Sequence, residues 1–266
     1  MTAGGEVITS TTNRRIKDLA RLHRRSERDA SGHFLVEGAR ELRSALAAGV
    51  EIEQVVLCEG LAGAEELETA AMAPPDRVLL VAPDPYARIS HRRHPDGLSA
   101  VARQFSTDLA EFDPGPNPIV LIADGVEKPG NLGAILRTAD AAGAAVLVSD
   151  AATDLFNPNV VRVAQGSLFT VPIALADGAT ARAWARDRLQ LFVATPEASL
   201  PYWTIDLTGS VGIVVGSEHR GVSDAWRDVG EQVSIPMAGS GDSLNTSVTA
   251  ALLLYEAVRQ RGPAID

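Results

Sequence analysis

The chain has 266 residues and a formal net charge of −10, with 45% hydrophobic and 22% charged residues. These values are typical of a folded globular protein and exclude a mainly disordered chain. Apolar runs such as Ile119–Ala123 and Ala250–Tyr255 are much shorter than the roughly 20 residues that span a bilayer. The single cysteine, Cys58, allows no internal disulfide, and the N-terminus lacks the apolar stretch of a secretory signal. We therefore expect a cytoplasmic protein that does not enter a membrane.

Basic residues are concentrated near the N-terminus of this acidic chain. Residues 1–43 hold nine Lys and Arg against six Asp and Glu, and seven of the nine lie between Arg14 and Arg28. An acidic protein binds nucleic acid only where its basic groups gather at the contact. The segment is therefore either a nucleic-acid-binding arm or a solvated helix face. A second basic loop, ARISHRRH at residues 87–94, is a candidate to join it.

The first hundred residues predict a small α/β unit. The basic segment has the apolar spacing of a helix, at Ile16, Leu19, Ala20 and Leu22. Further along we expect a helix at Glu37–Ala48 and strands at Phe34–Val36, Gln54–Cys58, Val78–Val81 and Leu98–Arg103. Pro and Gly then cluster in Phe112–Pro118, which is typical of a linker. We place the domain boundary there, with one domain at residues 1–112 and the other at residues 119–266.

After the linker, strands and helices alternate in the way that produces a parallel sheet. The expected strands are Ile119–Ala123, Ala145–Val148, Leu191–Ala194, Gly212–Val215 and Gln232–Ile235. The expected helices are Leu132–Ala142, Ala179–Arg188 and Thr246–Arg261.

Several common sites lack support in the sequence. The five histidines do not have HExxH spacing and there is no cysteine pair, so we expect no metal site. Neither GxGxxG after a strand nor GxxxxGK[ST] occurs, which disfavours dinucleotide and P-loop sites. The GSGDS run, Gly239–Ser243, does not match the GxSxG of a serine nucleophile and is interpreted as a turn.

Three other segments each contain or follow an expected strand of the second domain, where ligands bind in open α/β sheets. They include PGNLGAILRTADAAGA (residues 129–144), GSEHRGVS (residues 216–223) and IPM followed by SLNTSVTAALLLYE (residues 235–256). In this order they resemble the three signature motifs of the SpoU (TrmH) family of RNA ribose 2′-O-methyltransferases. FLVEGARELRSAL and DGLSAVA in the first domain are similar to that family's L30e-like substrate-binding domain.

The resemblance implies a fold, a reaction and partners. The fold would be a C-terminal α/β-knot (trefoil) methyltransferase domain with a smaller N-terminal L30e-like α/β domain. The reaction would be transfer of a methyl group from S-adenosylmethionine to a ribose 2′-hydroxyl of RNA by a homodimer. The separate N-terminal domain favours 23S ribosomal RNA as substrate, and some relatives of this kind confer resistance to thiostrepton or avilamycin. A tRNA ribose methyltransferase and a non-catalytic RNA-binding protein of ribosome assembly are the alternatives.

The resemblance also assigns residues to roles. The catalytic candidates are Asn131, Arg137, Glu218, Ser243 and Asn245. The cofactor-binding candidates are Thr195, Gly216, Ile235, Leu244 and again Asn245. The RNA-binding candidates are Arg14, Arg15, Arg21, Arg24, Arg25, Arg92 and Arg93.

These residue types suit the reaction, but each also has a simple structural interpretation. A ribose hydroxyl must be oriented and lose its proton as it attacks. Arg137 either accepts that proton, which the strong basicity of a guanidinium group makes demanding because the group is normally already protonated, or holds a phosphate and stabilises the developing negative charge. Alternatively, Asn131 caps its helix, either Ser243 or Asn245 caps the final helix, and Arg137 and Glu218 are ordinary surface groups.

Overall fold

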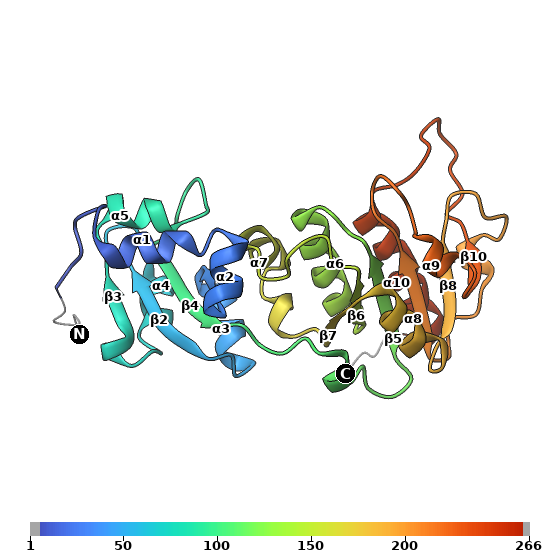
Figure 1. Ribbon diagram of the computed structural model, residues 1–266, viewed down its shortest axis with the longest axis horizontal. Helices are drawn as coiled ribbons and strands as arrows, with labels where there is room; N and C mark the ends of the chain where they lie inside the picture. Colours follow the sequence, from blue (N-terminus) through green and yellow to red (C-terminus); the bar gives the residue numbers. More distant parts are fainter. Residues whose placement is uncertain (1–5, 263–266) are drawn as a thin grey trace. The chain divides into compact units, whose positions relative to one another are not determined.

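A computed structural model describes residues 6–262, which fold into two compact units (Figure 1). Unit 1 comprises residues up to 105 together with residues 154–170, and unit 2 comprises residues 106–153 and those from 171 onward. Segment 154–170 lies within the range that we predicted for the second domain, yet it folds as part of unit 1. The functional assignment of the two predicted domains stays a prediction.

Unit 1 contains a mixed sheet with helices packed against it. Its strands are β1 (His33–Glu37), β2 (Ile52–Leu57), β3 (Val78–Leu80) and β4 (Leu98–Arg103), in the order β1-β4-β2-β3. β4 is antiparallel to β1 and β2, and β2 is parallel to β3. The helices are α1 (Arg14–Arg21), α2 (Arg25–Ser31), α3 (Ala39–Ala47), α4 (Ala64–Ala70), α5 (Pro83–Ile89) and α7 (Pro158–Ala164).

The apolar spacing of the basic segment has the predicted effect. Ile16, Leu19 and Leu22 are buried in one cluster with Leu35 of β1 and Val101 of β4. The charged residues of α1 consequently lie on its outer side. Burial of this apolar stripe, rather than helix propensity, stabilises so short a helix.

A buried ion pair and a group of aromatic rings attach segment 154–170 to unit 1. The Arg28 side chain is 1% exposed, and its Nε donates a hydrogen bond of 2.8 Å to Asp154 Oδ2. The ring of Phe34 lies 4.8 Å from that of Phe156 and 6.3 Å from that of Phe169. Breaking such a buried pair would leave one charge without a partner, which is costly. Arg28 is thus a structural residue, unlike the other arginines of the basic segment.

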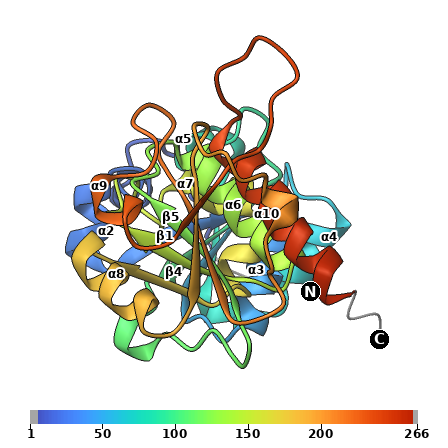
Figure 2. The same cartoon turned by 90° about the vertical axis from the view of Figure 1, so that its right-hand side faces the viewer.

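Unit 2 is a parallel sheet with helices on both faces. Its strands are β5 (Ile119–Asp124), β6 (Ala145–Ser149), β7 (Ile173–Ala176), β8 (Gln190–Ala194), β9 (Val211–Val215) and β10 (Glu231–Val233), in the order β10-β8-β9-β5-β6-β7. The pairings between these strands are all parallel. The helices are α6 (Pro129–Ala141), α8 (Gly178–Arg186), α9 (Asp224–Arg227) and α10 (Thr246–Arg261). α6 and α10 pack together on one face, and α8 and α9 lie on the other (Figure 2).

The strands predicted for this sheet are confirmed. Their sequence signal is clear because helices cover both faces of the sheet. Strands β5, β6 and β9 are buried along their whole length, which requires continuous apolar runs. β10 ends at Val233, two residues before the predicted end. β7 and α7 were not predicted. β7 is a short IALA run between Pro172 and Gly178, and α7 contains adjacent valines that weaken its helical signal.

Candidate functional site

A chain of side-chain hydrogen bonds joins the three signature segments at the carboxyl ends of β5 and β9. Asn131 lies in the first turn of α6, Glu218 in the loop after β9, and Asn245 immediately before α10. Asn245 Nδ2 donates a hydrogen bond of 3.2 Å to Asn131 Oδ1. Asn131 Nδ2 in turn donates to the carboxylate of Glu218. Glu218 and Asn245 are 87 and 114 positions from Asn131 in the sequence, and both contact this one asparagine.

The two asparagines differ in their relation to the helices. Asn245 is the N-cap of α10, because its Oδ1 accepts a hydrogen bond of 2.9 Å from the Ser247 N–H. Asn131 does not cap α6, whose N-cap position is Lys128. The helix-cap interpretation therefore explains part of the role of Asn245. It explains none of the side-chain contacts of Asn131.

Glu218 is held in its ionised form. Partial burial alone would raise its pKa, but hydrogen bonds from its own backbone, from the Asn131 amide and from the Glu127 N–H outweigh that effect, aided by the nearby charge of Lys128. The pKa of Glu218 is therefore below its usual value. A carboxylate with a lowered pKa is a weak proton acceptor near neutral pH. Its geometry and charge suit orientation of Asn131 better than removal of a proton.

A cavity of about 710 Å³ lies beside this chain, at the carboxyl ends of β8, β9 and β10; we call it the strand-edge cavity. The predicted residues that line it are Thr195, Gly216, Glu218, Ile235, Ser243 and Leu244. Much of its wall comes from the segments that follow the strands, where ligands bind in open α/β sheets. Of the predicted catalytic and cofactor-binding residues, Asn131, Arg137 and Asn245 do not line it.

Two features of the cavity suit a bound polar ligand. The Thr195 hydroxyl is buried and has no hydrogen-bond partner among the described residues. Buried hydroxyl groups normally have a partner. At Gly216 a Cβ atom would lie 2.1 Å from the Gly221 carbonyl carbon, so that only glycine allows the two backbone segments to approach so closely. The Thr246 hydroxyl also donates a hydrogen bond of 3.0 Å to the Gly216 carbonyl.

Sequence reasoning missed the group that holds the loop after β9. Asp124, buried at the end of β5, accepts hydrogen bonds from the Ser223 N–H at 2.8 Å and from Ser149 Oγ at 3.2 Å. Trp226 Nε1 donates to the same Ser149 hydroxyl at 3.1 Å. The available signal was a carboxylate ending an otherwise apolar strand, because a buried carboxylate requires hydrogen-bond donors. Asp124 thus fixes one end of the segment that carries Glu218.

Arg137 lies apart from these contacts. It is exposed on α6 and has no hydrogen bond or ion pair to any residue in the described range 6–262. None of the described residues, 6–262, forms an ion pair with its guanidinium group, which leaves the group free to bind an anion. The structure therefore brings together Asn131, Glu218 and Asn245, but not Arg137.

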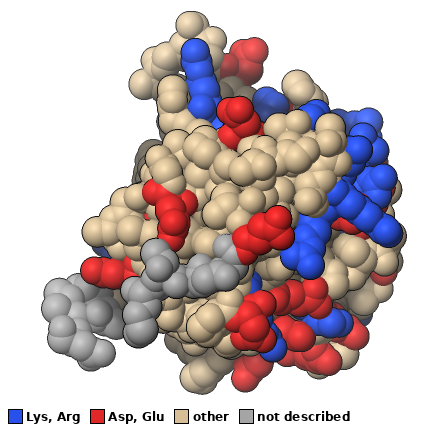
Figure 3. All heavy atoms as spheres, turned by 90° about the vertical axis from the view of Figure 1, so that its left-hand side faces the viewer, with Lys and Arg blue, Asp and Glu red and all other residues tan. Residues whose placement is uncertain are grey.

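The predicted RNA-binding arginines of unit 1 fall into two classes. The first class is exposed to solvent. It comprises Arg93 and five arginines in or between α1 and α2, namely Arg14, Arg15, Arg21, Arg24 and Arg25. Some of their charge is offset, since Asp18 lies near Arg14 and Arg21 and Asp29 near Arg25. Basic side chains gather along one side of the face in Figure 3. Arg92 is different, because it is half-buried and its guanidinium contacts Asp96, Glu41 and the Glu37 carbonyl.

Within residues 6–262, no group of three or more His, Cys, Asp or Glu side chains is placed to hold a metal ion. In the same range no helix is both long and apolar enough to cross a bilayer.

Comparison with known proteins identifies both parts of the chain. The model of the SpoU rRNA Methylase family matches residues 118–255, and that of the MRM3-like substrate binding domain matches residues 13–100. One curated relative is 23S rRNA (guanosine(2553)-2′-O)-methyltransferase RlmP of Bacillus subtilis. It is 29% identical over 251 residues, which cover 93% of this chain and 97% of the relative.

Solved structures are similar over nearly the whole chain. A crystal structure of an RNA 2′-O ribose methyltransferase has a TM-score of 0.87 and 46% sequence identity, covering 96% of this chain and 99% of that one. The SpoU methyltransferase AviRb from Streptomyces viridochromogenes, in complex with the cofactor AdoMet, has a TM-score of 0.85 and 30% identity. That match covers 94% of this chain and 98% of AviRb.

The close backbone approach at Gly216 generates a prediction. We expect Gly216→Ala to lower the free energy of unfolding by about 1–3 kcal/mol, because the added methyl group overpacks the contact with Gly221. The matched control is Gly239→Ala, where a Cβ atom meets nothing within 4 Å and should change stability by less than about 0.5 kcal/mol. Urea denaturation measures both variants. Equal stability of the two would show that the loop moves without cost.

Proposed function

Because this chain belongs to the SpoU rRNA methylase family, we propose that it transfers the methyl group of S-adenosylmethionine to a ribose 2′-hydroxyl of 23S ribosomal RNA. The family's α/β-knot fold is that of unit 2. The relative RlmP supports 23S rRNA as the substrate, and the AviRb complex supports AdoMet as the methyl donor. The observation that carries the proposal is the hydrogen-bonded chain of Asn245, Asn131 and Glu218 beside the strand-edge cavity.

The residues of the strand-edge cavity fit the methyl donor. We assign its binding to Thr195, Gly216, Ile235 and Leu244, which line the cavity, and to Asn245 beside it. The donor supplies a methyl group on a positively charged sulfur, so that no metal is needed to activate it. The unpartnered Thr195 hydroxyl is available to hydrogen-bond a polar group of the donor, and Gly216 leaves room at the cavity wall.

The polar groups at the cavity mouth then act on the RNA. The ribose 2′-oxygen forms a bond to the methyl carbon, the carbon–sulfur bond breaks with its electrons going to sulfur, and the hydroxyl proton passes to water or to Arg137. Glu218 orients Asn131, while Ser243 and Asn245 position the ribose. Arg137 either holds the adjacent phosphate and stabilises the developing charge or accepts the proton. The phosphate role is favoured because a guanidinium group gives up its proton with difficulty and because Arg137 has no hydrogen-bond or ion-pair partner among residues 6–262.

The reaction is tested by transfer of labelled methyl from S-adenosylmethionine to 23S rRNA, 16S rRNA and bulk tRNA. We expect incorporation into 23S rRNA, lowered about 100-fold by Arg137→Gln because a charge-stabilising donor is lost. The matched control is Arg186→Gln, an exposed helical arginine of unit 2 that should retain activity.

The other outcomes separate the alternatives. Incorporation into tRNA alone would make the protein a tRNA methyltransferase. A wild-type protein that binds S-adenosylmethionine yet methylates none of the three RNAs would contradict catalysis on free RNA and favour a binding role. Wild-type activity in Arg137→Gln would remove Arg137 from the reaction.

The likeness to AviRb supports a second part of the proposal, namely that this methylation protects the ribosome from an antibiotic. We expect expression of the wild-type chain in a sensitive bacterium to raise the inhibitory concentration of avilamycin or thiostrepton. Arg137→Gln should not raise it, since the modification would be absent. Primer extension checks methylation in the same cells. Modified 23S rRNA with unchanged sensitivity to both drugs would rule out this role and leave the enzymatic activity intact.

We also propose that the protein is a homodimer, on the evidence of an exposed apolar patch on α10. Val248, Leu252 and Tyr255 are 45%, 36% and 50% exposed, and the spacing places them on one helix face. Trp203 is 50% exposed in the 3₁₀ turn η4 (Tyr202–Thr204), which packs on α10. A patch of this kind is typical of a protein interface. Thr138, which follows Arg137 on α6, lines a cavity with Val248, Leu252 and Tyr255.

The dimer is tested by light scattering during size-exclusion chromatography. We expect the wild-type protein to have the mass of two chains and Leu252→Asp to have the mass of one, because a buried charge opposes association. Met72→Asp is the control, since Met72 is 59% exposed in unit 1 and lies outside the patch. Circular dichroism checks folding. A wild-type monomer, or a dimer that persists in folded Leu252→Asp, would contradict this interface.

A further inference from the structure

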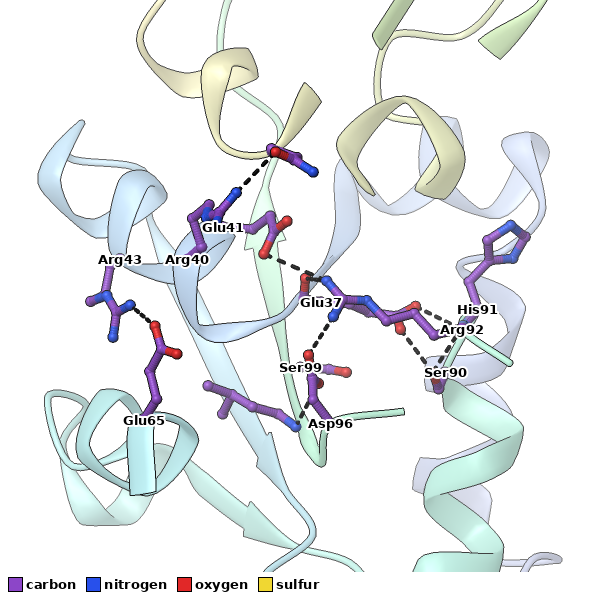
Figure 4. Close-up of polar contacts among 12 residues, drawn as sticks. Glu37, Arg40, Glu41, Arg43, Glu65, Ser90, His91, Arg92, Asp96 and Ser99 are labelled. Carbon is purple, nitrogen blue, oxygen red and sulfur yellow. Dashed lines mark hydrogen bonds and ion pairs between the residues drawn. The ribbon is translucent and has the colours of Figure 1, made fainter. Parts of the chain in front are cut away.

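Unit 1 contains an open, polar cavity of about 730 Å³ that the proposed reaction does not use. Figure 4 shows polar contacts among several of the residues that line it. Four parts of the chain form it: the turn from Gly38 to Glu41 at the start of α3, the start of α4, the loop from His91 to Asp96 between α5 and β4, and α7 with the residues after it. All four belong to unit 1. We call this the unit 1 cavity.

One arginine of the cavity is occupied by internal contacts. Arg92 donates a hydrogen bond of 2.7 Å to the Glu37 carbonyl, contacts the carboxylate of Asp96 and lies 3.5 Å from Glu41. Figure 4 shows its side chain reaching between these groups. The charge of Arg92 is therefore balanced by the two carboxylates. These contacts hold the loop that carries His91, Arg93 and His94 against the start of α3.

Three other arginines of the cavity form no ion pair with a carboxylate among the described residues, although the charge of Arg40 acts on nearby Glu41. Arg40 Nη1 donates to the side-chain oxygen of Gln165 at 2.9 Å, and Arg162 Nη2 donates to that of Asn159 at 2.6 Å. Both partners are neutral amides, which orient a guanidinium group without cancelling its charge. Arg93 is exposed, and its side chain forms no hydrogen bond or ion pair within residues 6–262.

The carboxylates of the cavity are more fully engaged. Glu41 and Asp96 face Arg92, and Glu65 contacts Arg43. Glu66 accepts a hydrogen bond of 3.0 Å from the Gly63 N–H at the start of α4. The groups left to interact with an incoming ligand are thus mainly guanidinium groups. These groups suit phosphate, because their planar N–H pairs match two of its oxygens.

The residues that line the unit 1 cavity come from two sequence modules, which are the two regions of the chain that match a family model. Arg162 and Gln165 lie within residues 118–255, which match the SpoU family, whereas the other residues that line it lie within residues 13–100. The N-terminal module alone therefore lacks one of the three unpaired arginines and the amide that orients another. The folding of segment 154–170 onto unit 1 completes the cavity.

We infer that the unit 1 cavity binds backbone phosphate of the RNA substrate through Arg40, Arg93 and Arg162. The inference rests on the proposed function for the identity of the polymer. Contacts of this kind provide affinity and fix the register of the RNA, but they carry no direct sequence information. The site therefore anchors the substrate, and selection of the target nucleotide falls to other residues.

The test measures binding of the full-length protein to a 23S rRNA transcript at several salt concentrations. We expect Arg40→Gln, Arg93→Gln and Arg162→Gln each to weaken binding by about tenfold, because a charge-assisted hydrogen bond is lost. Each should also reduce the slope of log K against log salt by about 0.7–0.9, the value for one lost phosphate contact. Arg162→Gln is the most informative of the three, since this residue lies outside the N-terminal module.

The matched control is Arg77→Gln. Arg77 is an exposed arginine of unit 1 that hydrogen-bonds the neutral Ile52 carbonyl at 3.0 Å and lies outside the cavity. It should retain wild-type affinity and slope. S-adenosylmethionine binding, measured in the same variants, should be unchanged, because the strand-edge cavity belongs to unit 2.

The result distinguishes this inference from the proposed function. If wild-type protein methylates 23S rRNA and all three cavity variants keep its affinity and salt slope, the cavity is not a phosphate site and the enzymatic proposal stands. If wild-type protein binds the transcript through the cavity but methylates no RNA, the inference stands and the proposed reaction is wrong. Weakening by Arg77→Gln equal to that of the cavity variants would show a non-specific loss of charge and overturn the inference.

Discussion

The candidate active site depends on the hydrogen bonds of one asparagine. Asn131 accepts from Asn245 and donates to Glu218, and it thereby joins segments that follow β5 and β9 to the start of the final helix. Each of these segments leaves the sheet at its carboxyl edge, where a parallel arrangement brings successive loops together. The sheet provides a rigid frame. The Asn131 side-chain amide fixes the positions of the three loops relative to one another through its hydrogen bonds.

The frame below this asparagine is itself held by a buried polar group. Asp124 accepts hydrogen bonds from the Ser223 backbone and the Ser149 hydroxyl, and Trp226 donates a hydrogen bond to the same hydroxyl. A buried carboxylate with all these donors makes the position of the Glu218 loop specific, because moving the loop would leave the charge unsatisfied. The same principle operates in unit 1, where the ion pair of Arg28 and Asp154 holds a segment contributed from much later in the sequence.

Electrostatics separates residues that look equivalent in the sequence. The chain is acidic overall, so its contacts with RNA depend on where cations are free rather than on their number. Arg28 and Arg92 are used internally, while Arg93, Arg137 and Arg162 have no carboxylate partner among the described residues. The free arginines occur in both units. This distribution suits an enzyme whose substrate is a long polyanion that contacts more than its catalytic centre.

The sequence by itself determined the core strands of the parallel sheet, the final helix and the family to which the chain belongs. It did so because buried parallel strands need continuous apolar runs, and because the three motifs occur in order. It did not reveal β7 or α7, whose short apolar runs are ambiguous, nor the attachment of segment 154–170 to unit 1. Adjacent arginines such as Arg92 and Arg93 are indistinguishable by composition. Only the tertiary structure decided which of them is buried against carboxylates and which is free, because the partners come from residues distant in the chain.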